Sequence, residues 1–196
     1  MNDVPSDAAW VTITAPLLPD QVAAFCRDLE RLYRINPYLE FRHWHDLPDG
    51  SAEVSYRNLS NGRDAVLRLI RTPDAGNGFT VRYDRGLKQS TRFEIEPASG
   101  GSRLRITDCY GSTAAENAPD TGSVDRSLHA WGVALHDYLQ REARWGGVPV
   151  WSLYMRRVWV PMKPAARRIT FIILLVTLAE LALFALVMAI YWIERE

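Results

Sequence analysis

Alternation of apolar and polar residues, with a period of two, recurs along the N-terminal part of the chain. It begins at residues 10–15 and returns after a helical region in six runs, at 38–46, 52–59, 64–71, 78–84, 89–96 and 102–110. The segments between these runs are turn-rich, for example LPDG, SNG, PDAGNG and PASGG. The pattern predicts seven strands, joined mostly by hairpins in an antiparallel sheet.

Two segments instead carry apolar residues at helical spacing. Residues 20–35 place Val22, Phe25 and Leu32 at such positions, and Asn36-Pro37 closes the region. Residues 124–144 carry a longer apolar stripe made of Leu128, Trp131, Leu135, Tyr138 and Leu139. The order predicts an α+β fold in which the long helix covers one face of the sheet.

The alternation also predicts which strand residues face that helix. The predicted inner face is apolar with scattered polar tips, and it includes Phe41, His43, His45, Val54, Tyr56, Leu67, Leu69, Phe79, Tyr83, Phe93, Ile106, Asp108 and Tyr110. Small-molecule pockets have this texture, and so do cores whose polar tips reach solvent. Both interpretations stay open on the sequence alone.

A continuous apolar run occupies residues 169–193 and contains a single ionisable residue, Glu180. A helix of this length crosses the ~30 Å hydrocarbon core of a bilayer. Five cations precede the run, namely Arg156, Arg157, Lys163, Arg167 and Arg168, while residues 194–196 follow it. By the positive-inside rule we expect a single-pass, tail-anchored protein whose N-terminal domain is cytoplasmic, at a bacterial inner membrane.

The chain is thus expected to divide into a domain at 8–145, a basic, Trp-rich juxtamembrane segment at 146–168 and a transmembrane helix at 169–193. Aromatics and cations interleave in the middle segment, so we expect its five cations to bind anionic lipid headgroups. The whole chain holds 23 basic and 23 acidic residues. This balance excludes a globally basic nucleic-acid binder, so no nucleic-acid partner is expected.

Glu180 lies near the middle of the apolar run. A carboxylate there costs about 2.5–3.5 kcal/mol on insertion scales, which favours a paired or protonated group. Small residues that permit close helix approach lie nearby, namely Ala182, Ala185 and Ala189. The pattern indicates a contact with another membrane helix, and tolerance of one polar residue is the alternative.

The stretch APLLPDQVAAFCRDLERLYRINPYLE lies between the first and second predicted strands. Through Ala15-Pro16, the helix at 22–28, Asp28-Leu29-Glu30 and Asn36-Pro37, and through the order of elements, residues 8–145 resemble the START-like superfamily, also called SRPBCC or polyketide cyclase-like. The resemblance implies the helix-grip fold, a seven-stranded antiparallel sheet curved around a long C-terminal helix, here followed by a single transmembrane helix. It further implies a hydrophobic cavity between sheet and helix, where family members bind lipids, sterols, quinones or polyketides.

Motifs for enzyme chemistry, such as GxSxG, HExxH and CxxC, do not occur in the sequence. His43 and His45 share a predicted strand face, and Asp108 is the only obvious third ligand, so we expect no metal site and no cofactor. A His43–Asp108 acid–base pair stays open as an alternative.

We therefore expect a membrane-tethered binding domain for a lipid-, sterol- or quinone-like molecule, without catalytic residues. The candidate ligand-binding residues are Phe41, His43, Tyr56, Tyr83, Phe93, Asp108, Tyr110 and Trp131. One alternative is an accessory or scaffold subunit that contacts other transmembrane subunits through Glu180. A less favoured one is a cyclase- or aromatase-type enzyme.

Overall fold

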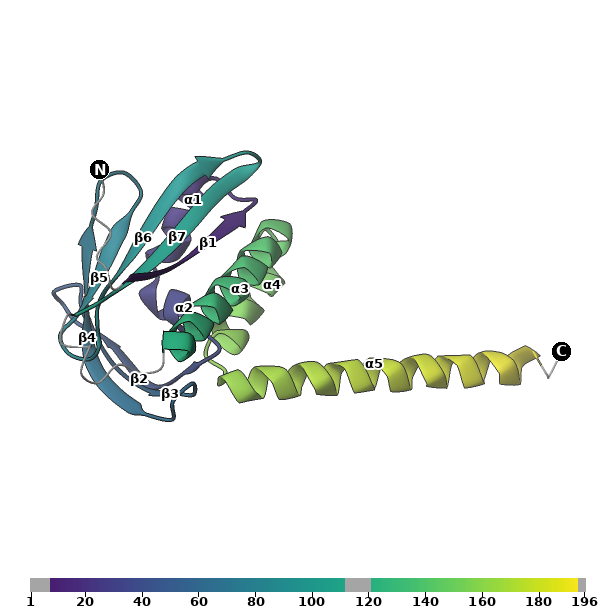
Figure 1. Ribbon diagram of the computed structural model, residues 1–196. Coiled ribbons are helices and arrows are strands. Elements are labelled where there is room, and N and C mark those ends of the chain that lie inside the picture. The colour runs from purple at the N-terminus through teal and green to yellow at the C-terminus, as the bar shows by residue number, and fades with distance from the viewer. Residues whose placement is uncertain (1–7, 112–120, 194–196) are drawn as a thin grey trace. The chain divides into compact units, whose positions relative to one another are not determined.

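Seven strands build the sheet: β1 Ala8–Ala15, β2 Leu39–Asp46, β3 Ala52–Asn58, β4 Asp64–Pro73, β5 Phe79–Tyr83, β6 Lys88–Ala98 and β7 Gly101–Tyr110. The structure is a computed structural model that describes residues 8–111 and 121–193, without the side chains of 121–126. All strand pairs are antiparallel, in the order β1-β7-β6-β5-β4-β3-β2 (Figure 1). The predicted seven-stranded antiparallel sheet is confirmed.

Consecutive strands from β2 to β7 are hydrogen-bonded neighbours, as hairpins require. The β6–β7 hairpin turns at Gly100 and Gly101, whose φ angles of +80° and +155° favour glycine. A Cβ atom at Gly101 would lie 2.1 Å from the carbonyl oxygen of Ala15. Glycine therefore allows this hairpin to approach the end of β1 closely.

Two short helices, α1 Pro19–Cys26 and α2 Leu29–Arg34, connect β1 to β2. The pattern predicted one helical region here, and the structure divides it into two helices. The break comes at Asp28, whose side chain accepts a hydrogen bond from the Arg31 backbone N–H at 3.0 Å and so caps α2.

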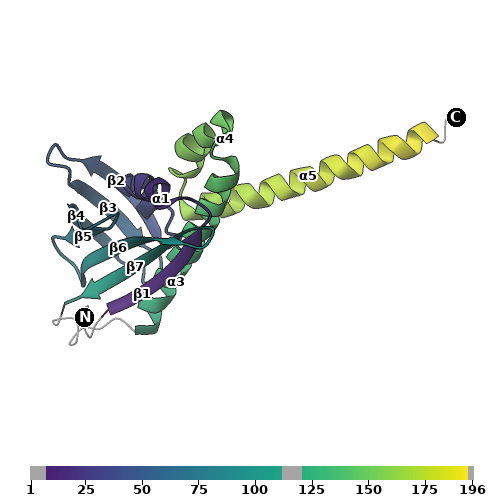
Figure 2. The ribbon, with the colours of Figure 1, turned by 90° about the horizontal axis from the view of Figure 1, so that it is seen from above.

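The long helix α3 Thr121–Trp145 packs against β1, and Figure 2 shows the two elements side by side. Its predicted apolar stripe is buried throughout: Leu128, Trp131, Leu135, Tyr138 and Leu139. The Trp131 indole N–H also donates to the carbonyl oxygen of Leu32 on α2, at 3.1 Å. The helix is therefore joined both to the sheet and to α2.

Two further helical segments, α4 Pro149–Tyr154 and the π-helical η2 Met155–Trp159, follow α3. Met155 and Val160 are buried in the core, and the Trp159 ring lies 5.7 Å from the ring of Tyr138. The first compact unit accordingly extends to Pro161, beyond the expected boundary at residue 145. Part of the expected juxtamembrane segment is thus packed on the domain.

The second compact unit starts at Met162 and contains α5 Pro164–Ile193. This helix has 30 residues, a mean hydropathy of 2.7 over its most apolar window, and none of that window is buried. It begins five residues before the predicted start at 169. Its length and composition are sufficient for crossing a membrane.

The predicted inward orientation of His43 and His45 is wrong. Phe41 pairs with Tyr56, but His43 pairs with Ser55, so β2 carries an extra residue at a bulge. A one-residue insertion moves every following side chain to the other face of the sheet. Both histidines are exposed and stack at 6.1 Å, while Trp44 packs inward on Phe41 at 5.3 Å.

Candidate functional site

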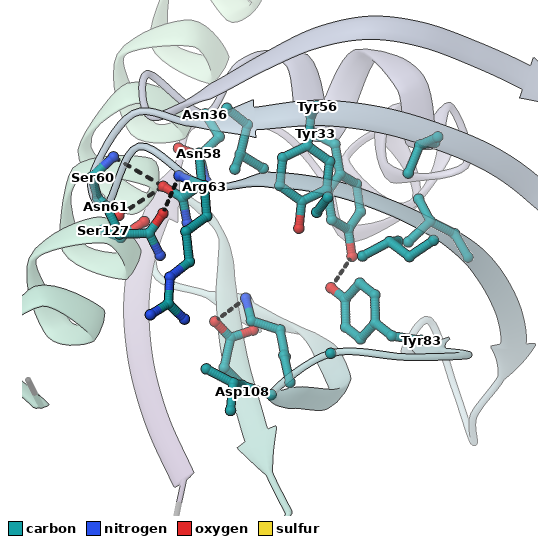
Figure 3. Close-up of a pocket in the computed structure, with 18 of the residues that line it drawn as sticks. Tyr33, Asn36, Tyr56, Asn58, Ser60, Asn61, Arg63, Tyr83, Asp108 and Ser127 are labelled. Atoms are coloured by element: carbon teal, nitrogen blue, oxygen red, sulfur yellow. Dashed lines mark hydrogen bonds and ion pairs between the residues drawn. The ribbon is translucent and has the colours of Figure 1, made fainter. Parts of the chain in front are cut away.

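A cavity of about 300 Å³ lies inside the first compact unit. Its lining comes from α2, from strands β2 to β4, from the β5–β6 turn, from β7 and from the N-terminal part of α3 (Figure 3). Because α3 covers β1 at one edge of the sheet, the space stays open between α3 and strands β2 to β4. The structure thus contains the space that the family resemblance implied.

One wall of the cavity is apolar. It comprises Leu39, Phe41, Val54, Leu67, Leu69, Leu128 and Trp131. Most of these side chains come from alternate positions of adjacent strands, so the inner-face periodicity of the sequence creates the wall directly. Burying apolar ligand surface against it stabilises a complex by about 25 cal/mol per Å².

A chain of hydroxyl groups crosses the base of the cavity. The oxygen atoms of Tyr33 and Tyr83 are 2.7 Å apart, and Tyr83 Oη lies 2.7 Å from Thr91 Oγ1. Thr91 in turn donates to Asp108 Oδ1 at 2.6 Å. A hydroxyl has one hydrogen, so Tyr83 must donate to Thr91 and Tyr33 must donate to Tyr83. All three hydrogens therefore point toward Asp108.

Asp108 ends this chain and is only 2% exposed. Lys88 compensates its charge, with Nζ at 2.5 Å from Asp108 Oδ2. Burial raises the pKa of Tyr33 and of Tyr83 well above the usual tyrosine value, so both hydroxyls keep their protons. Burial, followed by the negative charge of Asp108, also raises the pKa of Tyr56.

The mouth of the cavity is polar and comes largely from the turn between β3 and β4. There Asn58 Oδ1 accepts from the Ser60 backbone N–H at 3.0 Å, and Asn61 Oδ1 accepts from the Arg63 backbone N–H at 3.0 Å. Such turns are typical of asparagine. The Arg63 guanidinium makes no ion pair with any residue that the structure describes.

Six of the eight candidate ligand-binding residues line the cavity: Phe41, Tyr56, Tyr83, Asp108, Tyr110 and Trp131. His43 lies outside it because of the bulge in β2. Phe93 is fully buried instead, stacked on Phe79 at 4.5 Å and edge-on to Trp131 at 5.9 Å. It supports the cavity wall from behind.

Several lining residues were not among the candidates from the sequence, and three of them carry polar groups into the argument: Tyr33, Arg63 and Lys88. Tyr33 was treated as part of a helical core, and Lys88 and Arg63 fell in segments interpreted as turns. For Tyr33, the sequence offered one signal of a place in the site, namely an aromatic residue on the apolar side of a short helix. For Arg63 and Lys88 it offered none. The reach of Lys88 to Asp108 depends on how β6 pairs with β7, which periodicity does not reveal.

Two charged side chains of this site pair with each other, since Lys88 contacts Asp108. Within residues 8–111 and 121–193, no group of three His, Cys, Asp or Glu side chains is placed to hold a metal ion. The proton chain ends at a carboxylate that already accepts hydrogen bonds and pairs with Lys88. The arrangement thus provides an apolar slot with fixed polar groups at one end.

Comparisons with known proteins match the structure of this chain but not its sequence. No family model and no curated protein matches the sequence. Among solved structures, the Zhui aromatase/cyclase from a Streptomyces species is similar, with 17% sequence identity and a TM-score of 0.57. The superposition covers 71% of this chain and 97% of the Streptomyces chain. A START superfamily protein from Mycobacterium smegmatis has 18% identity and a TM-score of 0.50, and the match covers 67% of this chain and 94% of the Mycobacterium chain.

The domain has the START-like helix-grip fold. A third similar structure, a protein from Thermus thermophilus, has 14% identity, a TM-score of 0.52 and coverage of 69% of this chain and 97% of its own. At these identities the likeness concerns the fold of the START-like domain alone. The aromatase/cyclase activity is that of the Streptomyces protein.

Proposed function

We propose that this protein is a membrane-tethered START-like domain that binds a compact hydrophobic molecule at the cytoplasmic face of a membrane. The observation that carries the proposal is the cavity of about 300 Å³ between the sheet and α3, with its apolar wall and its polar end. Ligand sites are typically clefts of this kind, with mostly apolar walls and a few placed polar groups. A space of this kind therefore supports a binding function.

The volume narrows the class of ligand. Ligand pockets span about 300–1,000 Å³, so this one lies at the lower end. It suits one or a few fused rings, whereas a complete diacyl lipid exceeds it. A longer apolar tail would have to leave through the mouth near Arg63.

The apolar helix α5 supports the tether. It is long enough to span a bilayer with room for tilt. The five cations that precede the apolar run support a cytoplasmic domain, and Arg156, Arg157 and Lys163 are exposed. Anionic headgroups near such cations contribute about 1 kcal/mol for each residue at the surface.

Mass spectrometry tests the binding function. The full chain is purified in mild detergent and sprayed under native conditions. We expect a species heavier than the polypeptide by the mass of one small molecule, which organic extraction removes. Repeated preparations that hold only the bare polypeptide mass would contradict the proposal.

A protease-protection experiment tests the tether and its orientation. In inverted inner-membrane vesicles, added protease should digest the N-terminal domain, and in right-side-out vesicles it should not. Recovery of the chain in the supernatant after a carbonate wash would contradict the membrane anchor. Digestion only in right-side-out vesicles would reverse the proposed orientation.

A second candidate function rests on Glu180, a carboxylate inside the apolar helix α5. In this alternative the chain is an accessory subunit whose helix packs on another membrane protein. Co-purified membrane subunits should then be lost in Glu180→Leu and retained in Thr177→Leu, which removes another polar group of the same helix. Full retention in Glu180→Leu would exclude Glu180 as the contact.

A further inference from the structure

The carboxylate and amide oxygens that line the cavity already accept hydrogen bonds. Asp108 accepts from Thr91 and contacts Lys88, and Asp64 accepts from Arg42 at 3.0 Å. The amide oxygens that line the cavity accept hydrogen bonds as well. Asn36 Oδ1 accepts from the Tyr38 backbone N–H at 2.9 Å, and those of Asn58 and Asn61 accept within the β3–β4 turn.

The donor groups, in contrast, are largely unused. The Asx turns fix each asparagine oxygen toward the backbone, so the amide NH₂ groups of Asn36, Asn58 and Asn61 are left as donors. Among the described residues these NH₂ groups have no hydrogen-bond partner, and neither does the Arg63 guanidinium. The Lys88 ammonium group carries three hydrogens, and its ion pair with Asp108 is one contact of that group.

The Tyr56 hydroxyl is a further donor, and it has no hydrogen-bond partner among the residues that the structure describes. The Tyr56 side chain is half-buried, stacks against Phe41 at 5.4 Å and lines the cavity. Figure 3 shows it beside Tyr33, whose hydroxyl bonds to Tyr83, while no such bond is drawn from Tyr56. Its raised pKa keeps the hydroxyl protonated, so it presents an O–H to whatever fills the cavity.

We infer that the ligand carries hydrogen-bond-accepting oxygen, as a ketone, quinone or carboxylate group on a compact apolar ring system. This inference rests on the proposed binding function and specifies its ligand class. A hydrocarbon in the cavity would bury the Tyr56 donor without a partner, and such a loss is expensive. An acceptor oxygen beside Tyr56 would satisfy it, with the ring against the apolar wall.

Two probes that differ in one group, CH₂ or C=O, test the inference. Fluorene is a fused-ring hydrocarbon, and fluorenone has the same rings with a ketone C=O in place of the one CH₂ group. Each is titrated calorimetrically into the full chain in mild detergent, against a detergent blank. We expect fluorenone to bind about tenfold more tightly than fluorene.

Variants assign the preference to Tyr56. Tyr56→Phe removes only a hydroxyl without a described partner, and it should weaken fluorenone binding about five- to tenfold without changing fluorene binding. The control Tyr154→Phe removes a hydroxyl from the exposed side of α4, outside the cavity, and should change neither affinity. Thermal melts check that both variants are folded.

The outcomes separate the two proposals. Equal binding of both probes, or an unchanged fluorenone affinity in Tyr56→Phe, would overturn the inference and leave the binding function standing. Binding of neither probe up to its solubility limit would contradict both. A carboxylated fluorenone distinguishes a carboxylate from a neutral ketone as the accepting group. Arg63→Gln should weaken the binding of the anionic probe and leave the binding of neutral fluorenone unchanged.

Discussion

Arg31 is a buried arginine, 6% exposed, that joins α2 to α3. Its Nε and Nη2 atoms donate to the Tyr138 hydroxyl at 2.8 and 2.5 Å, and Nη2 lies 3.0 Å from Glu142 Oε1. The guanidinium also lies 5.0 Å from the ring centroids of Phe25 and Tyr138. One side chain therefore holds the N-terminal helices onto the helix that borders the cavity.

Replacing Arg31 should cost far more than replacing its neighbour Arg34. Arg31→Ala leaves the buried Tyr138 hydroxyl and the Glu142 carboxylate without their partner, so we expect the free energy of unfolding to fall by about 2–4 kcal/mol. Arg34→Ala removes an ion pair with Glu30 and a cation–π contact with the Phe41 ring, together worth about 1 kcal/mol. Urea denaturation of the full chain measures both. Similar losses in the two variants would contradict this role of Arg31.

Cys26 is fully buried in α1, and burial raises the pKa of its thiol from 9.0 to about 12. The folded state thus keeps a proton that the unfolded chain releases above pH 9, so stability from this group is complete below pH 9 and declines as the pH rises to about 12. At pH 8.5, iodoacetamide should modify the half-buried Cys109 well before Cys26 in the folded protein. Equal modification rates, measured by peptide mass mapping, would contradict the assigned burial.

At the scale of elements, the close packing of α3 against β1 depends on the absence of a side chain at Gly132. A Cβ atom there would lie 2.6 Å from Val11 Cγ2. Gly132→Ala should therefore destabilise the domain by about 1–3 kcal/mol, although alanine is the better helix former by ~1 kcal/mol. Val11→Ala in the same chain should restore most of the loss. A stabilised single variant in urea denaturation would show that the close approach does not constrain the helix.

The elements were predictable where one physical pattern dominates. Alternation located the strands because each has one buried face, and the stripe from Leu128 to Leu139 located the helix that covers them. The bulge in β2 was not predictable. The sequence EFRHWHD still follows a period of two, although the inserted residue moves His43 outward and Trp44 inward. Only the register against β3 reveals it.

At the scale of the whole molecule, the site combines residues that the sequence separates widely. Alternation identified Tyr56, Tyr83 and Asp108 because they share the inner face. The hydrogen-bonded chain also needs Tyr33, which α2 brings to within 2.7 Å of Tyr83. Such a contact depends on how a helix packs against a curved sheet, and no local pattern encodes that packing.

The same scale holds the central claim, that the cavity is occupied in the working protein. Ala65 lines it from β4 and pairs with Tyr56, whereas the next residue, Val66, is 65% exposed on the outer face. Ala65→Phe should fill the space from within, and Val66→Phe adds the same group outside it.

The most direct measurement is the fraction of each chain that carries a co-purified small molecule in native mass spectrometry. The account predicts a bound molecule in the unmodified protein and in Val66→Phe, and its loss in a folded Ala65→Phe. Equal occupancy in all three chains would place the ligand elsewhere, and an empty unmodified protein would contradict the binding function itself.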